Sequence, residues 1–245
     1  MSWRAIARSI GVLAATAVGS LERAIMPRSC VFCGVECESF ENFLCGGCAG
    51  DLPWNDNQCP GCAEPQQTPL TIGLQCANCQ VEPPPFAAAA APFRYAFPVD
   101  AAIKLLKFHR RLEYAQAFGV VMAGMLAQLP ADIDGLLPVP LHWRRQAVRG
   151  FNQADELCRH LHKQSGLPIV RNVRRVRSTP YQSGLDAAAR SQNLNTAFVV
   201  QGGTVARHIL IVDDVITTGA TCIQLTRALL RAGTPRVSVL ALARR

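Results

Sequence analysis

The apolar positions of the chain follow two spacings, and their alternation predicts a series of strands and helices. Short apolar runs rich in β-branched residues, such as Ile209–Val212, predict buried strands. Apolar positions three or four residues apart, as in Gln153–Ser165, predict amphipathic helices. The alternation favours an α/β domain with a mostly parallel sheet covered on both faces. The run Ile209–Val212 is the centre of a strand predicted over His208–Asp213. The other predicted strands are Phe93–Phe97, Leu136–Pro140, Ala197–Val200 and Val237–Leu242, and the other helices are two within residues 99–128 and one over Ala220–Ala232.

The first residues show a helical pattern of their own. Arg4 and Arg8 precede the apolar stretch Ile10–Val18, an arrangement that faintly resembles a secretory signal. An apolar stripe at helical spacing favours a docked amphipathic helix over residues 1–27 instead. No apolar run reaches the length of a membrane-spanning helix. The stripe consists of Trp3, Ile6, Ile10, Leu13, Ala17 and Leu21.

The strand that ends at Asp213 leads into the segment with the clearest candidate chemistry. Asp213 and Asp214 follow the apolar run, and Thr217–Thr221 then bring hydroxyls and small side chains to the start of a predicted helix. A loop at a helix N-terminus offers backbone N–H groups and a favourable dipole to one phosphate. Carboxylates beside that phosphate need a neutral partner or a metal, and sugar hydroxyls are such a partner. The segment therefore predicts a ribose 5-phosphate site, with a ligand-free capping turn as the alternative.

The formal net charge of +8 favours anionic ligands, namely phosphates, pyrophosphate or nucleic acid, without choosing among them. One basic stretch follows the predicted strand Leu136–Pro140 and contains Arg144, Arg145, Arg149 and Gly150. Because ligands of open α/β sheets bind at the carboxyl ends of the strands, we expect this stretch to form a basic loop beside the aspartates. Such a loop suits pyrophosphate, and a solvated surface loop is the alternative.

A second basic stretch, Arg171–Arg177, contains four arginines and leads into a segment with small and polar residues. We expect a basic strand followed by a flexible loop. The loop could close over a bound ligand during turnover, or the arginines could contact DNA phosphates, and the residues leave both readings open. The segment after the arginines includes Thr179, Gln182, Ser183, Gly184, Leu185, Arg190 and Asn193.

Four Cys-x-x-Cys pairs lie between residues 30 and 80 and account for eight of the eleven cysteines. Two such pairs supply the four thiolates of a tetrahedral Zn²⁺ site. Eleven residues separate the first two pairs and thirteen the last two, so the simplest arrangement is two zinc ribbons in tandem, with interleaved pairing left open. The pairs are Cys30/Cys33, Cys45/Cys48, Cys59/Cys62 and Cys76/Cys79.

The alternatives to zinc are a disulfide framework and an iron–sulfur cluster. Disulfides need an oxidising compartment, whereas a sugar-phosphate site and unpaired cysteines favour the cytosol. A cluster would use only four of the eight thiols. We therefore expect structural zinc, in a module with too small a core to fold without metal. Residues 30–80 contain no Lys or Arg, so this module suits a protein partner better than DNA.

Residues 209–221 also resemble the thirteen-residue phosphoribosyl pyrophosphate (PRPP) motif of type I phosphoribosyltransferases, and they match it at every position. Residues 27–245 are similar to the ComF family, including the proteins called GntX. The features that carry this resemblance are the PRPP motif, the cysteine pairs, Pro138–Pro140, Arg149–Gln153 and the Thr179/Gln182/Leu185/Arg190/Asn193 series. The resemblance implies a double zinc ribbon over residues 28–82 and a type I phosphoribosyltransferase domain over residues 87–245. It also implies a cytoplasmic protein linked to natural transformation and DNA uptake.

The resemblance implies a glycosyltransferase that moves a pentosyl group from PRPP, with Mg²⁺ on the pyrophosphate and an acceptor that the sequence does not name. Asp213 and Asp214 are then the catalytic residues, and basic loops assist pyrophosphate departure. The alternative is a non-catalytic competence adaptor that binds single-stranded DNA and, through the zinc ribbons, a protein of the uptake machinery. The implied PRPP-binding residues are Val212, Asp213, Asp214, Val215, Thr217, Thr218, Gly219, Ala220 and Thr221.

Overall fold

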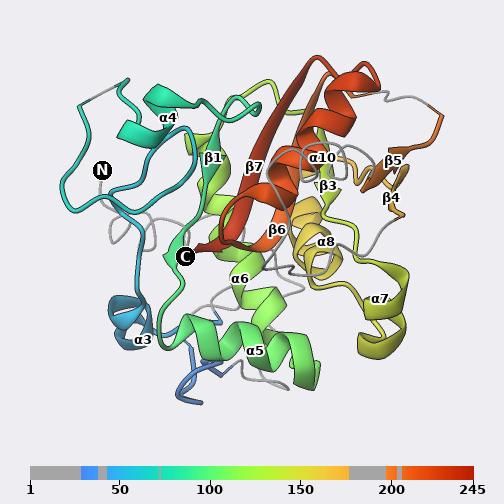
Figure 1. Cartoon of the computed structure of the whole chain (residues 1–245). Helices are drawn as coiled ribbons and strands as arrows, with labels where there is room; N and C mark the ends of the chain where they lie inside the picture. Colours follow the sequence, from blue (N-terminus) through green and yellow to red (C-terminus); the bar gives the residue numbers. More distant parts are fainter. Residues whose placement is uncertain (1–28, 38–42, 72, 177–196, 203–205) are drawn as a thin grey trace, which may run out of the picture.

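The structure is a computed structural model of the chain (Figure 1). It describes residues 29–37, 43–71, 73–176, 197–202 and 206–245. The helix predicted over residues 1–27 and the loop predicted after Arg177 lie outside these residues. Among the described residues, none of the helices has the length and apolar character needed to cross a membrane.

A parallel sheet forms the centre of the molecule, with the strand order β1-β7-β6-β3 and with β2 also paired to β7. The register is the same for β1 and β2, since Ala89 pairs with Val239 and Phe93 with Ala243. They therefore form one edge strand interrupted around Pro92, which has no N–H to donate. The strands are β1 (Ala89–Ala90), β2 (Phe93–Arg94), β3 (Gly135–Pro138), β6 (His208–Ile216) and β7 (Arg236–Arg244), and an antiparallel pair is formed by β4 (Val173–Arg175) and β5 (Phe198–Val200).

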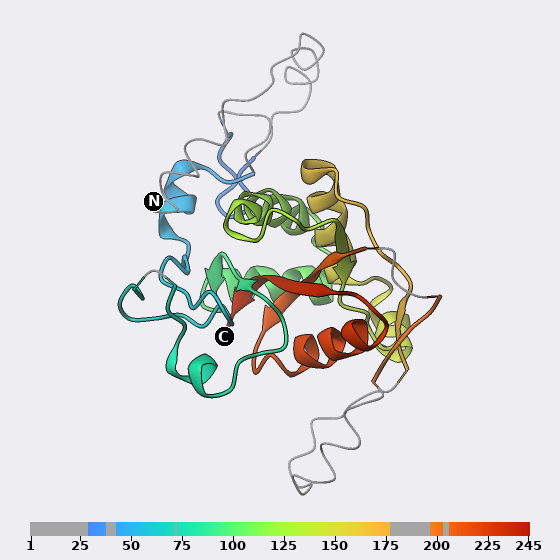
Figure 2. The ribbon, with the colours of Figure 1, turned by 90° about the horizontal axis from the view of Figure 1, so that it is seen from above.

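Helices cover both faces of this sheet (Figure 2). Alternate residues of β6 point to opposite faces: Leu210 and Val212 pack with the helices of one face, and Ile209 and Ile211 pack with α10 on the other. This arrangement confirms the predicted α/β architecture, with a mostly parallel sheet flanked by helices. The first face carries α5 (Val99–His109), α6 (Glu113–Gly124), the 3-10 turn η2 (Met125–Gln128) and α8 (Gln153–Ser165), and the second carries α10 (Ala220–Arg231).

Three elements differ from their predicted form. The strand predicted over Phe93–Phe97 is only two residues long, as β2, because its partner β7 ends at Arg244, which pairs with Arg94. Strand β6 was expected to end at Asp213 but runs to Ile216, because β7 continues beside it and pairs Ile216 with Arg244. The basic stretch after β3 was expected to be a loop, but it forms the helix α7 (Trp143–Arg149). Arg, Gln and Ala are good helix formers, and the segment contains no Gly or Pro before Gly150, so a helix is its favoured local structure.

The cysteine-rich segment, with its short helices α3 (Gly46–Asp51) and α4 (Ala77–Val81), lies against the edge of the sheet (Figure 1). Trp54 forms an antiparallel bridge with Phe93, and their rings lie 4.7 Å apart. Backbone hydrogen bonds of 2.8 Å run from the N–H of Asn55 to Pro92 and from the N–H of Arg94 to Pro53. The segment therefore caps the exposed edge of the sheet and shares the core of the α/β domain.

Candidate functional site

The turn between β6 and α10 has the backbone form expected of a phosphate-binding loop. Gly219 precedes the first residue of α10 with a φ of 76°, a conformation that residues with a Cβ rarely adopt. Thr217 and Thr218 are exposed, and the Oγ1 of Thr218 accepts a hydrogen bond of 3.4 Å from the N–H of Ala220. The first turn of the helix therefore presents backbone N–H groups and the positive end of its dipole at this turn.

The two aspartates lie immediately before this turn. On one side of β6 the pairing with β3 ends at Val212, whereas on the other side β7 continues past Asp213. Asp213 and Asp214 thus lie within a strand but beyond the carboxyl end of β3, where they are partly exposed. The structure therefore brings the predicted carboxylates and the predicted phosphate loop together within residues 213–221 of one β–α connection.

The carboxylates are held in different environments. The carboxylate of Asp214 forms an ion pair with the ammonium of Lys107 on α5, with 2.9 Å between Oδ2 and Nζ. The Oδ1 of Asp213 accepts a hydrogen bond of 2.8 Å from the N–H of Asp214. Burial raises the pKa of Asp213 to about 7, and the negative charge of Asp214 contributes to the rise. The hydrogen bond from the N–H of Asp214 and the cations of Lys107 and Arg175 act in the opposite direction.

The predicted pyrophosphate residues lie around the start of α8, and the described ones have partners within the protein. Arg149 donates to the Oε1 of Gln153 at 3.2 Å and lies over the ring of Phe108, 5.3 Å from its centroid. Gly150 adopts a φ of 75°. Arg144 and Arg145 belong to α7, and their side chains lie outside the part of the chain that the structure describes.

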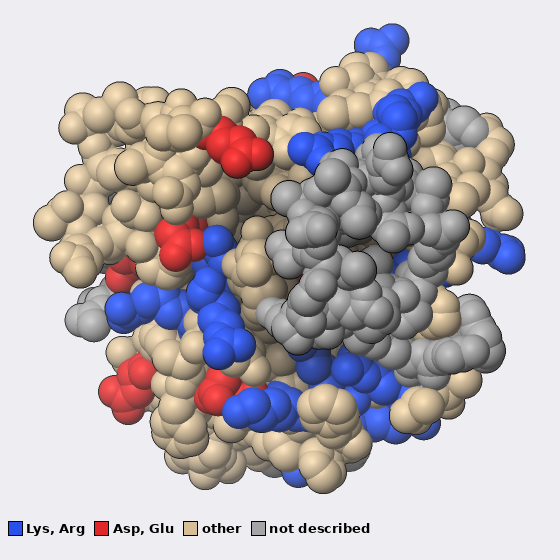
Figure 3. Space-filling view, in the orientation of Figure 1, with Lys and Arg blue, Asp and Glu red and all other residues tan. Residues whose placement is uncertain are grey.

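A cavity of about 620 Å³ opens at the carboxyl end of β3, and its lining includes Pro138, Gly150, Phe151 and five arginines. Two of the five form ion pairs with Asp155 at the start of α8, Arg171 at 2.6 Å and Arg159 at 3.0 Å. Figure 3 shows that Lys and Arg side chains are widespread on one face of the molecule. The arginines of the cavity are Arg110, Arg159, Arg171, Arg174 and Arg175.

Sequence reasoning missed two basic residues that contact the candidate site. Lys107 lies in the stretch 99–128, where the sequence predicted two helices and no site residue, yet it pairs with Asp214. Arg244, the last residue of β7, donates to the carbonyl oxygens of Ile216 and Thr217 at the start of the predicted phosphate loop. Neither residue belongs to a motif, so no local signal in the sequence could have identified them.

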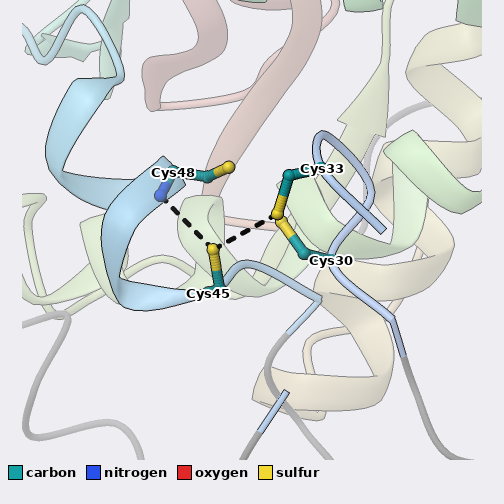
Figure 4. Close-up of side chains that lie close together, drawn as sticks. All are labelled: Cys30, Cys33, Cys45 and Cys48. Atoms are coloured by element: carbon teal, nitrogen blue, oxygen red, sulfur yellow. Dashed lines mark hydrogen bonds between the residues drawn. The ribbon is translucent and has the colours of Figure 1, made fainter. Parts of the chain in front are cut away.

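The eight cysteines form two groups of four, and within each group all four sulfur atoms lie within 4.8 Å of one another. In the first group, shown in Figure 4, the Sγ atoms of Cys33 and Cys45 are 3.6 Å apart, and the N–H of Cys48 points to the Sγ of Cys45 at 3.4 Å. In the second group, the Sγ atoms of Cys62 and Cys76 are 3.7 Å apart. The groups are Cys30/Cys33/Cys45/Cys48 and Cys59/Cys62/Cys76/Cys79, which is the sequential arrangement.

These sulfur positions suit a tetrahedral metal. A metal–sulfur distance of about 2.3 Å places the sulfurs of a tetrahedral site roughly 3.8 Å apart, close to the observed values. All eleven cysteines are free of disulfide bonds. Burial raises the pKa of Cys30, but hydrogen bonds from backbone N–H groups at Cys45, Cys33 and Phe32 outweigh it and lower the pKa to about 6, which favours the thiolate.

Comparison with solved structures gives partial likenesses, of which two are described. The allosteric regulatory enzyme of purine biosynthesis aligns with 49% of this chain and 24% of its own, at 22% identity and a TM-score of 0.33. The hypoxanthine phosphoribosyl transferase of Trypanosoma cruzi aligns with 54% of this chain and 71% of its own, at 14% identity and a TM-score of 0.31. No protein-family model matches the chain.

Comparison with curated proteins gives relatives that span nearly the whole chain. DNA utilization protein YhgH of Escherichia coli K12 is 36% identical over 213 residues, which cover 82% of this chain and 90% of the relative. Competence protein F of Haemophilus influenzae is 32% identical over 225 residues, which cover 88% and 96%. Competence protein ComFC of Bacillus subtilis is 26% identical over 184 residues, which cover 71% and 72%. Identity above 30% across most of both chains, together with two four-cysteine groups ahead of an α/β domain, shows that this chain belongs to the ComF family.

Proposed function

We propose that the chain binds PRPP with Mg²⁺ and transfers its ribose 5-phosphate to an acceptor. The observation that carries this proposal is the β6–α10 connection, where two partly exposed carboxylates precede a glycine-capped helix N-terminus. A phosphate group fits the backbone N–H groups of the turn, and a ribose fits the carboxylates of Asp213 and Asp214, which lie four and three positions before Thr217 on the strand. A ribose 5-phosphate group fits both halves of the connection.

In this proposal each half of the connection has its own task. Thr217–Thr221 hold the 5-phosphate through backbone N–H groups and hydroxyls. Asp213 and Asp214 accept hydrogen bonds from the ribose hydroxyls, and their charge stabilises the positive charge that develops at the anomeric carbon as pyrophosphate leaves. Lys107 orients the carboxylate of Asp214 through their ion pair until the ribose arrives.

Mg²⁺ fits this site only if the phosphates of the ligand supply part of its coordination. The groups of three or more potential metal ligands among the described residues are the two cysteine groups, so the protein offers a magnesium ion at most the two aspartates. Mg²⁺ is commonly bound by one or two carboxylates together with substrate phosphates. When bound with PRPP, it supplies charge neutralisation on the pyrophosphate. With Asp213 and Asp214 assigned to the ribose, the described residues of this connection leave no further carboxylate to act as a general base, so the acceptor attacks with an atom that needs no prior deprotonation.

We also propose that each cysteine group holds a structural Zn²⁺. The sulfur spacing and the free thiols support this assignment. With four protein ligands the metal keeps no open position for a substrate. Its contribution is the folding of the segment that caps the sheet edge at Trp54 and Phe93.

Titration calorimetry with PRPP and Mg²⁺ tests the proposed function. Wild type should bind, and the double variant Asp213→Asn/Asp214→Asn should not. Asp100→Asn is the matched control, because Asp100 also pairs with a lysine of α5, Lys104, but lies outside the candidate site. Absence of binding by wild type would refute the enzymatic reading. Pyrophosphate release that depends on an added metabolite would then distinguish an enzyme from a PRPP sensor and identify the acceptor.

The names of the relatives connect the proposal to DNA uptake, which is the process that we propose for this chain. A second candidate function, a non-catalytic adaptor that binds single-stranded DNA, is favoured by the cavity with five arginines. Arginine groups bind the phosphates of a nucleic acid backbone. The cysteine-rich segment, which has no Lys or Arg between residues 30 and 80, would then contact a protein of the uptake machinery.

Binding of single-stranded DNA at increasing salt tests the adaptor. Replacing Arg171, Arg174, Arg175 and Arg177 by alanine should weaken binding and flatten its salt dependence, since each lost phosphate contact removes part of the counterion release. Unchanged affinity in this variant would contradict the adaptor reading.

A further inference from the structure

Arg244 connects the second cysteine group to the candidate phosphate loop. Its side chain is 11% exposed and forms an ion pair with the carboxylate of Glu64. Its guanidinium also donates to the carbonyl oxygen of Cys62 at 3.3 Å, to that of Ile216 at 3.2 Å and to that of Thr217. One buried cation thus contacts a cysteine knuckle on one side and the β6–α10 turn on the other.

The contacts on the loop side fix the orientation of two consecutive peptide groups. In a trans peptide the C=O and the following N–H point in opposite directions. Because Arg244 holds the carbonyl oxygens of Ile216 and Thr217, the N–H groups of Thr217 and Thr218 point away from the guanidinium. The N–H of Arg245 adds a hydrogen bond of 3.0 Å to the same oxygen of Ile216. These N–H groups belong to the turn that we assign to the 5-phosphate.

The contacts on the other side depend on the fold of the second knuckle. The turn Cys59–Glu64 is closed by hydrogen bonds from the N–H of Cys59 to Glu64 at 3.0 Å and from the N–H of Ala63 to Cys59 at 2.8 Å. The two thiols of this turn belong to the same four-cysteine group as Cys76 and Cys79, so they would share the proposed metal with them. Loss of the metal releases the turn, and with it the positions of the Cys62 carbonyl and the Glu64 carboxylate.

The first cysteine group is attached to a different part of the domain. Its Phe32 packs against the rings of Tyr114 and Phe118 on α6, at centroid distances of 5.6 and 6.4 Å. The chain therefore contains a matched pair of metal groups, one in contact with the phosphate loop through Arg244 and one packed on a helix.

We propose that Arg244 is a positioning residue that couples metal binding at the second cysteine group to the order of the phosphate loop, and thereby to PRPP affinity. The part concerning PRPP rests on the proposed function, whereas the coupling between the metal and the loop does not. Metal loss at the second group, or removal of the guanidinium, should disorder the same backbone N–H groups.

Hydrogen–deuterium exchange of the full-length, zinc-loaded protein without PRPP measures this coupling directly. In Arg244→Lys the zinc content should equal that of wild type, while exchange at Thr217–Thr221 becomes on the order of tenfold faster. A lysine keeps the charge but cannot span the carbonyls and the carboxylate together. Glu64→Gln, which weakens only the ion pair, should give a smaller increase in the same segment.

A double-mutant comparison tests whether the metal acts through Arg244. Cys79→Ser should speed exchange at Thr217–Thr221 in the presence of Arg244 and add nothing in the Arg244→Lys background. Cys48→Ser, which opens the first group, should leave that segment unchanged. Additive effects, or an unchanged exchange rate in Arg244→Lys, would overturn the proposal.

PRPP titration then separates the two proposals. If wild type binds PRPP, Arg244→Lys should bind it about tenfold more weakly, and equal affinity would overturn the part of the inference that concerns PRPP. If wild type binds no PRPP while the exchange coupling is present, the proposed function fails and the coupling stands.

Discussion

Replacing Asp213 by asparagine should stabilise the fold at neutral pH, although it removes a residue that we assign to the ribose. Burial and the neighbouring charge of Asp214 raise the pKa of Asp213 to about 7, from an ordinary value of 3.8. Its folded-state pKa therefore exceeds its unfolded-state pKa. The favourable contribution of the neutral carboxyl is fully present below pH 3.8 and is lost as the pH rises through about 7.

The magnitude follows from the size of this shift. The difference is roughly three pKa units, and one unit corresponds to about 1.36 kcal/mol, so the upper limit is about 4 kcal/mol. Because Asp213 is partly exposed, solvent screening reduces the effect. We therefore expect the free energy of unfolding of Asp213→Asn to be about 2 kcal/mol larger than that of wild type at pH 8. The gain should shrink as the pH falls toward 5.

Urea unfolding at several pH values between 5 and 9 measures this gain as the difference between variant and wild type at each pH. Taking differences removes the contribution of zinc, whose thiolate ligands also respond to pH. Asp56→Asn, at an exposed aspartate, is the control and should change stability by less than about 0.5 kcal/mol at every pH. An Asp213→Asn protein that is less stable than wild type at pH 8, or whose gain does not depend on pH, would refute the assigned environment.

Three further predictions concern the elements that support the site. Trp54→Ala should cost about 3–5 kcal/mol of unfolding free energy in urea, because a buried ring at the module boundary is removed, whereas Phe97→Ala, at an 81% exposed ring, should cost little. Lys107→Met should lower the free energy of unfolding by about 1–2 kcal/mol at pH 8 and by less at pH 5, because two carboxylates lose their cation. The control Lys104→Met, at an exposed lysine, should change the free energy of unfolding by less than about 0.5 kcal/mol. An equal loss at both pH values in Lys107→Met would contradict this prediction. Metal removal by a strong chelator should release two zinc ions per chain, measured by a colorimetric indicator, and lower the thermal midpoint, and an unchanged midpoint in zinc-free protein would contradict a structural role.

Elements with local signals were predicted well from the sequence. Helix α8 begins and ends where predicted, because Asn152 caps it, with its Oδ1 accepting from the N–H of Ala154, and Gly166 ends it with a φ of 74°. The core of β6 was predicted from its unbroken apolar run. The cysteine spacing predicted the sequential grouping that the structure shows.

Elements that depend on a neighbour were not predicted. Strand β1 lies in an alanine run, and Ala has little preference for strands, so its extended form is imposed by pairing with β7. The last residues of β6 are held by β7 in the same way. The arginines of the α7 segment led to the prediction of a binding loop. The segment forms a helix because it contains good helix formers and no helix breaker.

The sequence predicted the residues of the candidate site that are contiguous in the chain, but not those that reach it from other elements. Asp213, Asp214 and the following turn are contiguous, so one segment of sequence was enough to find them. Lys107 and Arg244 reach the site from other elements, 107 and 27 positions away from their partners Asp214 and Thr217. Such contacts arise from the packing of α5 and β7 around β6, which no local pattern encodes.

The central claim is that the β6–α10 connection binds PRPP, and calorimetric titration of the zinc-loaded protein with PRPP and Mg²⁺ tests it most directly. The account predicts saturable binding by wild type and by Asp100→Asn, and none by Asp213→Asn/Asp214→Asn. Absence of binding by wild type, or equal binding by the double variant, would contradict it.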